Sequence, residues 1–291
     1  MHKTSIKTDM TSSIFDIFNY FILILLCVVT LYPFLYTMSA SISDPLLVMQ
    51  NRIVLFPKGI NFDAYQLVFQ KMDIGRGFYN SVVYTVVGTA INILFTSITA
   101  YALSRKEFAL RIFITKFIVF TMFFSGGLIP TFLVVRYLGM YNSMWALVVP
   151  VAIATWNLLI LKSFFSQIPE SLIESARIDG SHDLYILFKI IFPLSLPALA
   201  TIGLFYAVGH WNNFFSALIF ITDNKLYPLQ LMIRNISILE NIVDVVTIDN
   251  SILFKNIKYA VIFISSLPMI CLYPFIQRYF VKGVTIGSLK E

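Results

Sequence analysis

Six long apolar stretches divide this chain and restrict the folds that it can adopt. They cover residues 14–38, 79–103, 112–135, 143–165, 198–221 and 259–280. About 20 apolar residues in a helix cross the hydrocarbon core of a bilayer, where every backbone polar group must find its partner within the protein. The sequence therefore predicts an all-α polytopic membrane protein with about six transmembrane helices, forming a single domain over residues 1–291.

The composition excludes an ordinary soluble protein. Of the 291 residues, 58% are hydrophobic and only 12% are charged, whereas soluble domains are about half apolar and about a quarter charged. A net charge of +6 would suggest nucleic-acid binding in a soluble protein. In a membrane protein it indicates Lys and Arg retained on the cytoplasmic side, so we expect no nucleic-acid partner.

The short connections between the apolar stretches predict the orientation. Residues 104–116 hold four basic side chains, whereas residues 136–142, on the opposite side, hold only Arg136. Short basic loops stay in the cytoplasm, although the long loops, which also hold basic residues, report orientation poorly. We therefore expect a multi-pass membrane protein with both termini in the cytoplasm.

No sequence pattern indicates catalysis, a metal centre or ATP binding. His2, His182 and His210 are isolated, and no phosphate-binding loop is present. Cys27 and Cys271 both lie in apolar stretches, which disfavours a disulfide framework. The first apolar stretch is too long for a removable signal peptide. We expect no catalytic residue, no metal ligand and no cofactor in this chain.

One polar interruption, residues 167–197, separates two of the apolar stretches. Pro169 is suited to the first turn of a helix, because the N–H that it lacks is not needed there. Leu172, Ile173 and Ala176 then follow at helical spacing and predict one apolar stripe, and Gly180 is expected to end the helix after Asp179. The pattern predicts a short amphipathic helix on a membrane face, which a partner could contact.

The spacing within this interruption resembles the EAA loop of ABC importer permeases. The motif residues are Glu174-Ser175-Ala176, then Gly180 three residues later, then Ile190-Ile191-Phe192-Pro193 after nine more. The family pattern has Ala in place of Ser175 and Leu in place of Phe192, and both replacements preserve the helix and its turn. The alternative is an ordinary amphipathic loop helix, which would leave the Gly and Pro spacing unexplained.

The resemblance implies a type I ABC importer permease fold and a cytoplasmic coupling loop at 167–197. In that family the loop helix docks in a cleft of the ATPase, where the motif Glu forms a polar contact. Glu174 is thus the main candidate for coupling. Arg177 is a weaker candidate for the same contact, because a solvated surface position explains this residue equally well. The residues predicted to couple this chain to an ATPase are Leu172, Ile173, Glu174, Ser175, Ala176, Asp179 and Gly180.

Trp and Asn side chains at membrane depth suggest a path for a sugar, because aromatic faces and amides bind sugar rings and hydroxyls. The tentative path residues are Trp156, Asn157, Trp211, Asn212 and Asn213. For each single residue, helix packing is the stronger explanation. Packing also explains a seam of small and polar residues, namely Ser81, Gly88, Asn92 and Ser97. Residues 125–130 contain two Gly and one Pro, so we expect them to kink the third span.

Further motifs resemble the carbohydrate branch of these permeases. They are residues 209–215, residues 227–230 and the ending 279–290. This resemblance implies a location in the bacterial plasma membrane and a heterodimer with a second permease. It also implies two ATPase subunits that bind ATP and Mg, and an extracytoplasmic solute-binding protein. The long segments 39–78 and 222–258 would face that binding protein.

Three alternatives remain at this point. The same fold could import another solute, such as an amino acid or phosphate. An ion-coupled secondary transporter is disfavoured, because such proteins place charged residues inside their spans, and the centres of the second, fourth and fifth spans have none. A membrane scaffold without transport activity would not account for the 167–197 spacing.

Overall fold

The computed structural model of the chain describes residues 10–71, 73–243, 256–272, 274 and 277. These residues form helices and connections, with no β-strand among them. Contacts divide the chain into two compact units, one within Met1–Met72 and Ile236–Ile264, the other within Asp73–Asn235 and Ser265–Glu291. The assignment of the whole chain to one permease domain stays a prediction, because compactness alone does not define a functional domain.

The first unit is dominated by α1 (Met10–Ser41), which continues through Pro33. None of its 18-residue apolar window is buried, as expected of a helix that faces lipid or another chain. Two shorter helices follow within the segment 39–78, α2 (Pro45–Met49) and α3 (Asp63–Lys71). The Tyr65 hydroxyl of α3 lies 2.8 Å from Ser41 Oγ, which holds α3 to the end of α1.

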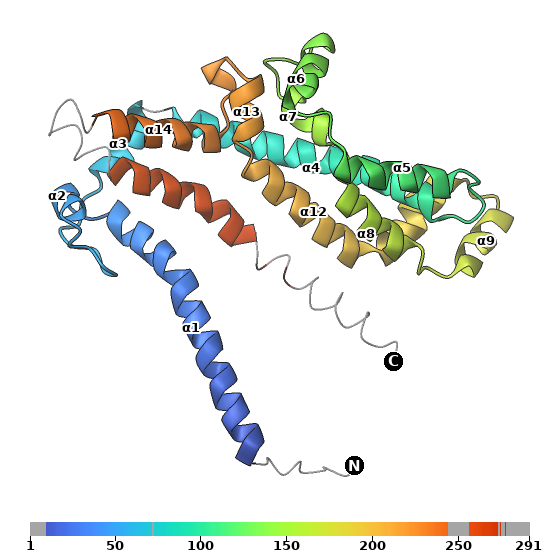
Figure 1. The fold of residues 1–291 in the computed structure, drawn as a ribbon, viewed down its shortest axis with the longest axis horizontal. Helices are drawn as coiled ribbons and strands as arrows, with labels where there is room; N and C mark the ends of the chain where they lie inside the picture. Colours follow the sequence, from blue (N-terminus) through green and yellow to red (C-terminus); the bar gives the residue numbers. More distant parts are fainter. Residues whose placement is uncertain (1–9, 72, 244–255, 273, 275–276, 278–291) are drawn as a thin grey trace. The chain divides into compact units, whose positions relative to one another are not determined.

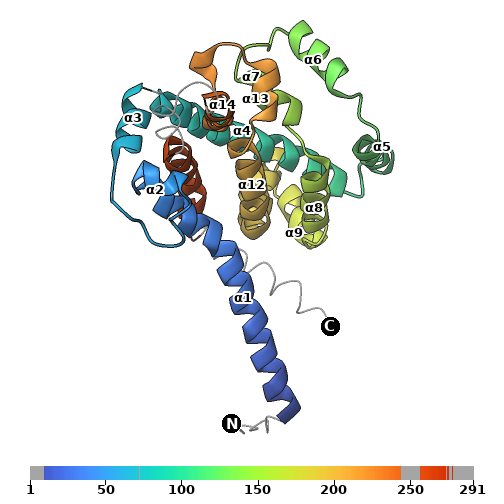
Figure 2. The ribbon, with the colours of Figure 1, turned by 60° about the vertical axis from the view of Figure 1, so that its left-hand side comes forward.

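The second unit is built along α4 (Ile74–Ser104). Figures 1 and 2 show α12 (Leu196–Trp211) and α8 (Thr155–Phe165) running alongside it. Small residues allow the close approach, since a Cβ on Gly203 would lie 3.0 Å from Ile93 Cδ1. The predicted seam is confirmed as a buried face of α4, consisting of Ser81, Gly88, Asn92 and Ser97.

Three of the predicted spans are broken. Helices α5 (Arg111–Phe123) and α6 (Leu128–Tyr137) meet at 117°, on either side of the Gly pair whose second member, Gly127, has a φ of +87°. The third span is therefore not one kinked helix but two helices. Without a side chain at Gly127, the backbone can take a conformation that other residues rarely adopt.

The fourth span also bends, and a further bend lies just before the predicted fifth span, within the predicted loop 167–197. Helix α7 (Trp145–Val148) and η1 (Val149–Val151) meet α8 at 50°. The segment Asp183–Leu194, which contains α10 (Asp183–Ile186), the π-helical η2 (Leu187–Ile191) and α11 (Phe192–Leu194), meets α12 at 91°. The predicted fifth span, 198–221, was too long at its end, since α12 stops at Trp211 and α13 (Phe215–Phe220) is separate.

Each of the six predicted apolar stretches still corresponds to one apolar region of the described structure. Two unbroken helices are long and apolar enough to cross a membrane, and up to five spans result if each bent pair counts as one. The sixth region is the shorter helix Asn256–Leu272. The rest of that predicted span lies largely outside the described residues, and the C-terminal motif 279–290 and residues 244–255 lie wholly outside them.

The segment 222–258 begins with η3 (Asn224–Leu226) and α14 (Leu229–Val243). Side chains of α4 hold this beginning in place. Asn80 Nδ2 donates to the Lys225 carbonyl at 2.9 Å, and the Leu229 N–H donates to Ser81 Oγ at 2.8 Å. Part of the predicted partner-facing segment is thus an ordered extension of the helical core.

Candidate functional site

The polar interruption folds as the short helix α9 (Glu170–Ile178). Pro169 precedes the helix as its capping residue, one position earlier than predicted. At the other end Gly180 has a φ of +81°, and its N–H bonds the Arg177 carbonyl while the Ser181 N–H bonds the Ala176 carbonyl. This pair of bonds is the Schellman arrangement, which satisfies the last carbonyls of a helix and requires a left-handed residue. The predicted helix end at Asp179–Gly180 is confirmed.

Two side chains anchor α9 to the core. Ile173 and Ala176 are buried in a cluster that also contains Phe165 and Ile186. Leu172 was predicted to share this stripe, but it is 45% exposed. The reason is geometric, because adjacent residues on a helix are about 100° apart, so Leu172 lies at the margin of the buried face.

The opposite side of α9 is open to solvent. Glu174, Ser175, Asp179 and Gly180 are all exposed. Ile178 is 86% exposed, and the sequence analysis did not select it. A single exposed apolar side chain is common on protein surfaces, so the interest of Ile178 lies in its place beside the exposed Glu174. Its spacing of four residues from Glu174 would have placed it on the same face.

Several acidic and basic residues around α9 form ion pairs with one another. Lys106 pairs with Glu170 at 3.2 Å, and Arg177 pairs with Glu107 at 2.7 Å and with Asp183 at 3.1 Å. These hydrogen bonds, to Glu107 first and then to Asp183, raise the pKa of Arg177 above its ordinary value. Arg177 is therefore engaged within the chain by two acidic side chains.

Glu174, by contrast, has no ion pair or hydrogen bond to any residue that the structure describes. Its carboxylate is exposed on a helix whose neighbouring acidic residue, Glu170, is paired. A carboxylate in this setting is fully available to a cationic side chain of another protein.

A second arginine, Arg105, connects the end of α4 to the end of α8. Arg105 follows α4 and is 9% exposed. Its Nη2 donates to the Phe165 carbonyl at the end of α8 at 2.8 Å, its Nε donates to Ser104 Oγ at 3.0 Å, and its guanidinium lies 5.2 Å from the Tyr101 ring centre. Burial lowers the pKa of Arg105 below its ordinary value.

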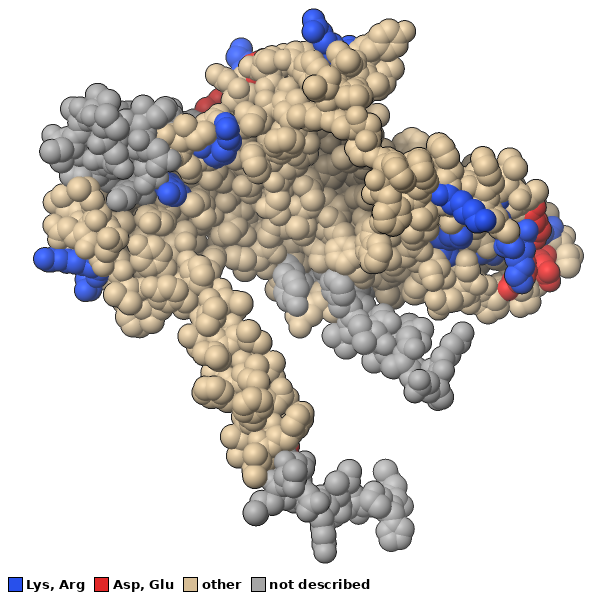
Figure 3. All heavy atoms as spheres, viewed as in Figure 1, with Lys and Arg blue, Asp and Glu red and all other residues tan. Residues whose placement is uncertain are grey.

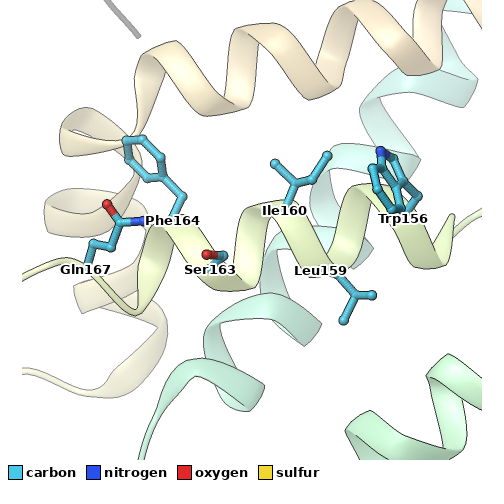
Figure 4. A pocket seen from close by; sticks show the side chains of 6 residues that line it. All are labelled: Trp156, Leu159, Ile160, Ser163, Phe164 and Gln167. Atoms are coloured by element: carbon cyan, nitrogen blue, oxygen red, sulfur yellow. The ribbon is translucent and has the colours of Figure 1, made fainter. Parts of the chain in front are cut away.

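The five Trp and Asn residues proposed for a substrate path do not come together. Trp156 lines a groove of about 390 Å³ whose side chains all come from α8 and the residue Gln167 just beyond it (Figure 4). Trp211 is buried, donates from Nε1 to the Ser265 carbonyl at 3.0 Å, and lines an apolar cavity of about 500 Å³. Asn212 is exposed and caps α12, where its Nδ2 donates to the Val208 carbonyl at 3.0 Å.

Asn157 and Asn213, by contrast, line one and the same cavity. It has a volume of about 260 Å³ and lies at the break between η1 and α8. Its other lining residues are Val151, Ala154, Phe205, Tyr206, Gly209 and His210. Two aromatic rings, two amides, an imidazole and a hydroxyl thus surround one space, and such a set can contact both the faces and the hydroxyls of a sugar.

Sequence reasoning missed Tyr206 and treated His210 as packing. The Tyr206 hydroxyl lies 2.7 Å from Thr96 Oγ1 and accepts a hydrogen bond of 2.9 Å from the Ala154 N–H. Irregular backbone at membrane depth needs such partners. The tyrosine at helical spacing from His210 was the available signal.

Among the residues that the structure describes, no group of three His, Cys, Asp or Glu side chains could hold a metal ion. The cavities described above are lined by amides, hydroxyls and aromatic rings, with His210 as the one imidazole among these lining residues. The arrangement is suited to binding and movement.

The sequence of the chain is similar to those of known transport proteins. A family model described as "Binding-protein-dependent transport system inner membrane component" matches residues 92–286. The "Polygalacturonan/rhamnogalacturonan transport system permease protein YtcP" of Bacillus subtilis (strain 168) is 41% identical over 285 residues, covering 97% of this chain and 100% of that protein. "Protein LplC" of the same organism is 41% identical over 297 residues, covering 100% of this chain and 98% of that protein.

A solved structure is similar over nearly the whole chain. The crystal structure of a bacterial ABC transporter involved in the import of the acidic polysaccharide alginate matches with a TM-score of 0.85 and 34% identity, covering 94% of this chain and 98% of that chain. Permeases of this kind are not enzymes themselves and work with other subunits. The chain belongs to the family of binding-protein-dependent transport system inner membrane components, as a membrane-spanning permease subunit of an ABC importer.

Proposed function

We propose that this permease imports oligosaccharides and that α9 couples it to a separate ATPase. The observation that carries the coupling role concerns Glu174, which is exposed and has no partner among the described residues. It lies on a helix anchored by Ile173 and Ala176. A helix held on one side and open on the other can receive a displacement from a partner and pass it to the core. Ser175, Asp179 and Gly180 complete the open face and its end.

The proposed complex contains this chain, a second permease, two ATPase subunits that bind ATP and Mg, and an extracytoplasmic solute-binding protein. The α9 side and both termini lie in the cytoplasm, in agreement with the basic connection 104–116. The segments 39–78 and 222–258 face the binding protein. ATPase closure moves α9, and the spans alternate between inward-open and outward-open states.

For the cargo we propose fragments of uronate-containing polysaccharides. The permease YtcP is named for polygalacturonan and rhamnogalacturonan transport, and the similar solved transporter imports alginate, an acidic polysaccharide. Sugar hydroxyls outnumber carboxylates in such fragments, so a cavity with amides and aromatic rings suits them. Asn157 and Asn213 are the predicted path residues best placed for this contact.

Two alternatives are less well supported. Import of amino acids or phosphate would leave the sugar-related names of the relatives without explanation. Ion-coupled transporters usually place Asp, Glu, Lys, Arg or His inside their spans. Among the residues that line the 260 Å³ cavity His210 is the one such residue, and its Nε2 is already hydrogen-bonded to Asn92 Oδ1.

The coupling proposal is tested with the assembled transporter in proteoliposomes that contain the binding protein. Glu174→Gln should abolish ATP-driven uptake, and Glu174→Asp should retain part of it, because the partner contact needs the charge. Ser171→Ala is the matched control, since Ser171 is an exposed, uncharged residue of the same helix. Wild-type uptake by Glu174→Gln would refute the coupling role.

The cargo proposal is tested by offering the same proteoliposomes oligogalacturonate and maltotriose. Uptake of the acidic oligosaccharide alone supports the proposal. Uptake of maltotriose alone would keep the importer but overturn the cargo class. ATP-independent uptake of either sugar would overturn the ABC coupling itself.

A further inference from the structure

Two ion pairs fasten the two ends of α9 to the connection between α4 and α5. Lys106 pairs with Glu170 in the first turn, and Glu107 pairs with Arg177 in the last turn. Lys106 and Glu107 are adjacent and opposite in charge. Their partners are also opposite in charge and lie about two turns apart on the helix, so the two pairs match in sign and in position.

Arg177 also connects a third segment to these two ion pairs, which together we call the clamp. Its Nη2 lies 3.1 Å from Asp183 Oδ1 at the start of α10, and the same carboxylate oxygen accepts a hydrogen bond of 3.3 Å from the Tyr101 hydroxyl on α4. Figure 3 shows basic and acidic side chains gathered at the right-hand end of the view, where Figure 1 places α9. One guanidinium therefore connects α9, α10 and the end of α4.

The exposure of these pairs argues against a role in folding stability. The side chains of Arg177, Glu107 and Asp183 are 33%, 54% and 64% exposed. Ion pairs open to solvent add little to stability, because water screens them and the side chains lose freedom. They can nevertheless fix the direction of a nine-residue helix in which only Ile173 and Ala176 are buried.

We propose that Arg177 is a positioning residue that makes α9 and the connection 105–110 move as one body, so that a displacement of α9 passes directly into α4. The inference rests on the proposed role of α9 as the ATPase contact. Since α4 lies against both α8 and α12, motion delivered to its end reaches the helices that surround the 260 Å³ cavity.

The experiment replaces the ion pair by a removable covalent link. In the assembled transporter, Cys27→Ser and Cys271→Ser give a background free of exposed native cysteines, and Glu107→Cys with Arg177→Cys is added. Before cross-linking, the number of ATP molecules hydrolysed per cargo imported should rise on the order of fivefold, the lower end of usual coupling between linked sites. A short bifunctional thiol reagent should then restore the background ratio.

Three controls separate positioning from folding. Arg177→Cys alone, treated with the same reagent, should stay uncoupled. Arg177→Gln should also raise the ratio, whereas Arg136→Gln, which changes an exposed arginine at the end of α6, should leave it unchanged. Thermal denaturation midpoints of all these complexes should agree with that of the background.

Two results would overturn the inference. A background-like ratio in Arg177→Gln would show that the clamp transmits nothing. Loss of transport on cross-linking, with ATP hydrolysis retained, would show that α9 must move relative to the connection. Absence of ATP-driven uptake in the background itself would instead refute the proposed function, so the two failures are distinguishable.

Discussion

His210 on α12 and Asn92 on α4 form a hydrogen bond of 2.6 Å between Nε2 and Oδ1. The Asn92 amide also donates from Nδ2 to the Val151 carbonyl, at the break before α8. Because the amide nitrogen is used as a donor, its oxygen accepts, and His210 Nε2 carries the hydrogen. The buried Asn92 thus links three segments of the second unit, namely α4, α12 and η1.

Replacing Gly88 by Ala should break this link. A Cβ at Gly88 would lie 2.5 Å from His210 Nε2, so the imidazole would have to move. We expect a loss of about 1–3 kcal/mol, the usual cost of overpacking, measured by denaturant unfolding of the purified complex. Gly75→Ala is the control, since its Cβ would meet nothing within 4 Å. Equal stability of the two variants would contradict the packing described.

The hydroxyl of Tyr206 should matter more than that of Thr96. Tyr206→Phe removes the bond between these hydroxyls and also leaves the Ala154 N–H without its acceptor. An orphaned buried donor costs about 1–3 kcal/mol, so Tyr206→Phe should destabilise the protein more than Thr96→Val. In a double-mutant cycle the combined variant should lose less than the sum of the two, and strict additivity would rule out a shared bond.

Two isoleucines of α9 should give opposite phenotypes. Ile173 is 1% exposed and Ile178 is 86% exposed. Ile173→Ala should lower the stability by about 2–5 kcal/mol, while Ile178→Ser should change it by less than about 0.5 kcal/mol. Ile178→Ser should instead reduce the amount of ATPase that copurifies with the chain. Undiminished ATPase recovery would remove Ile178 from the contact surface.

The stability of the first unit should depend on pH through Tyr65. Burial raises the pKa of Tyr65 above its ordinary value, with a smaller opposing effect of the Ser41 hydrogen bond. The folded protein therefore favours the neutral phenol, and stability falls as the pH rises above about 10, where the unfolded chain loses this proton first. The fall ends once the pH exceeds the pKa of the folded state.

The measurement compares denaturation midpoints of wild type and Tyr65→Phe between about pH 8 and 12. The difference between the two should shrink as the pH rises, because the variant lacks the titrating group. Tyr137→Phe, which removes a phenol on a 90% exposed residue, serves as the control. A difference that is independent of pH would contradict the assignment.

The sequence predicted the parts of the fold that depend on local chemistry. The apolar stretches, the break between α5 and α6 and the end of α9 at Gly180 all follow from nearby residues. Gly, Pro and hydrophobic runs act over a few positions, so their effects can be inferred without the tertiary structure.

The parts that could not be predicted depend on contacts between distant residues. Arg177 finds Glu107 across 70 residues, and its pairing is invisible in the local sequence. The run Trp211-Asn212-Asn213 suggested one site, but α12 ends there, and its three side chains enter different surroundings. Adjacent side chains at a helix end point in different directions, and the surrounding tertiary packing determines which residues each of them contacts.

The left-handed turn at Gly180 also constrains the number of residues between α9 and α10. Each added residue rotates everything after it by about 100° around the helix axis, and the turn can form only where a residue tolerates positive φ. One insertion between Arg177 and Gly180 would therefore carry Asp183 out of reach of Arg177 while leaving every residue type in place. In this segment the count of residues is under as much physical constraint as their identity, and length changes here should be far less tolerated than substitutions.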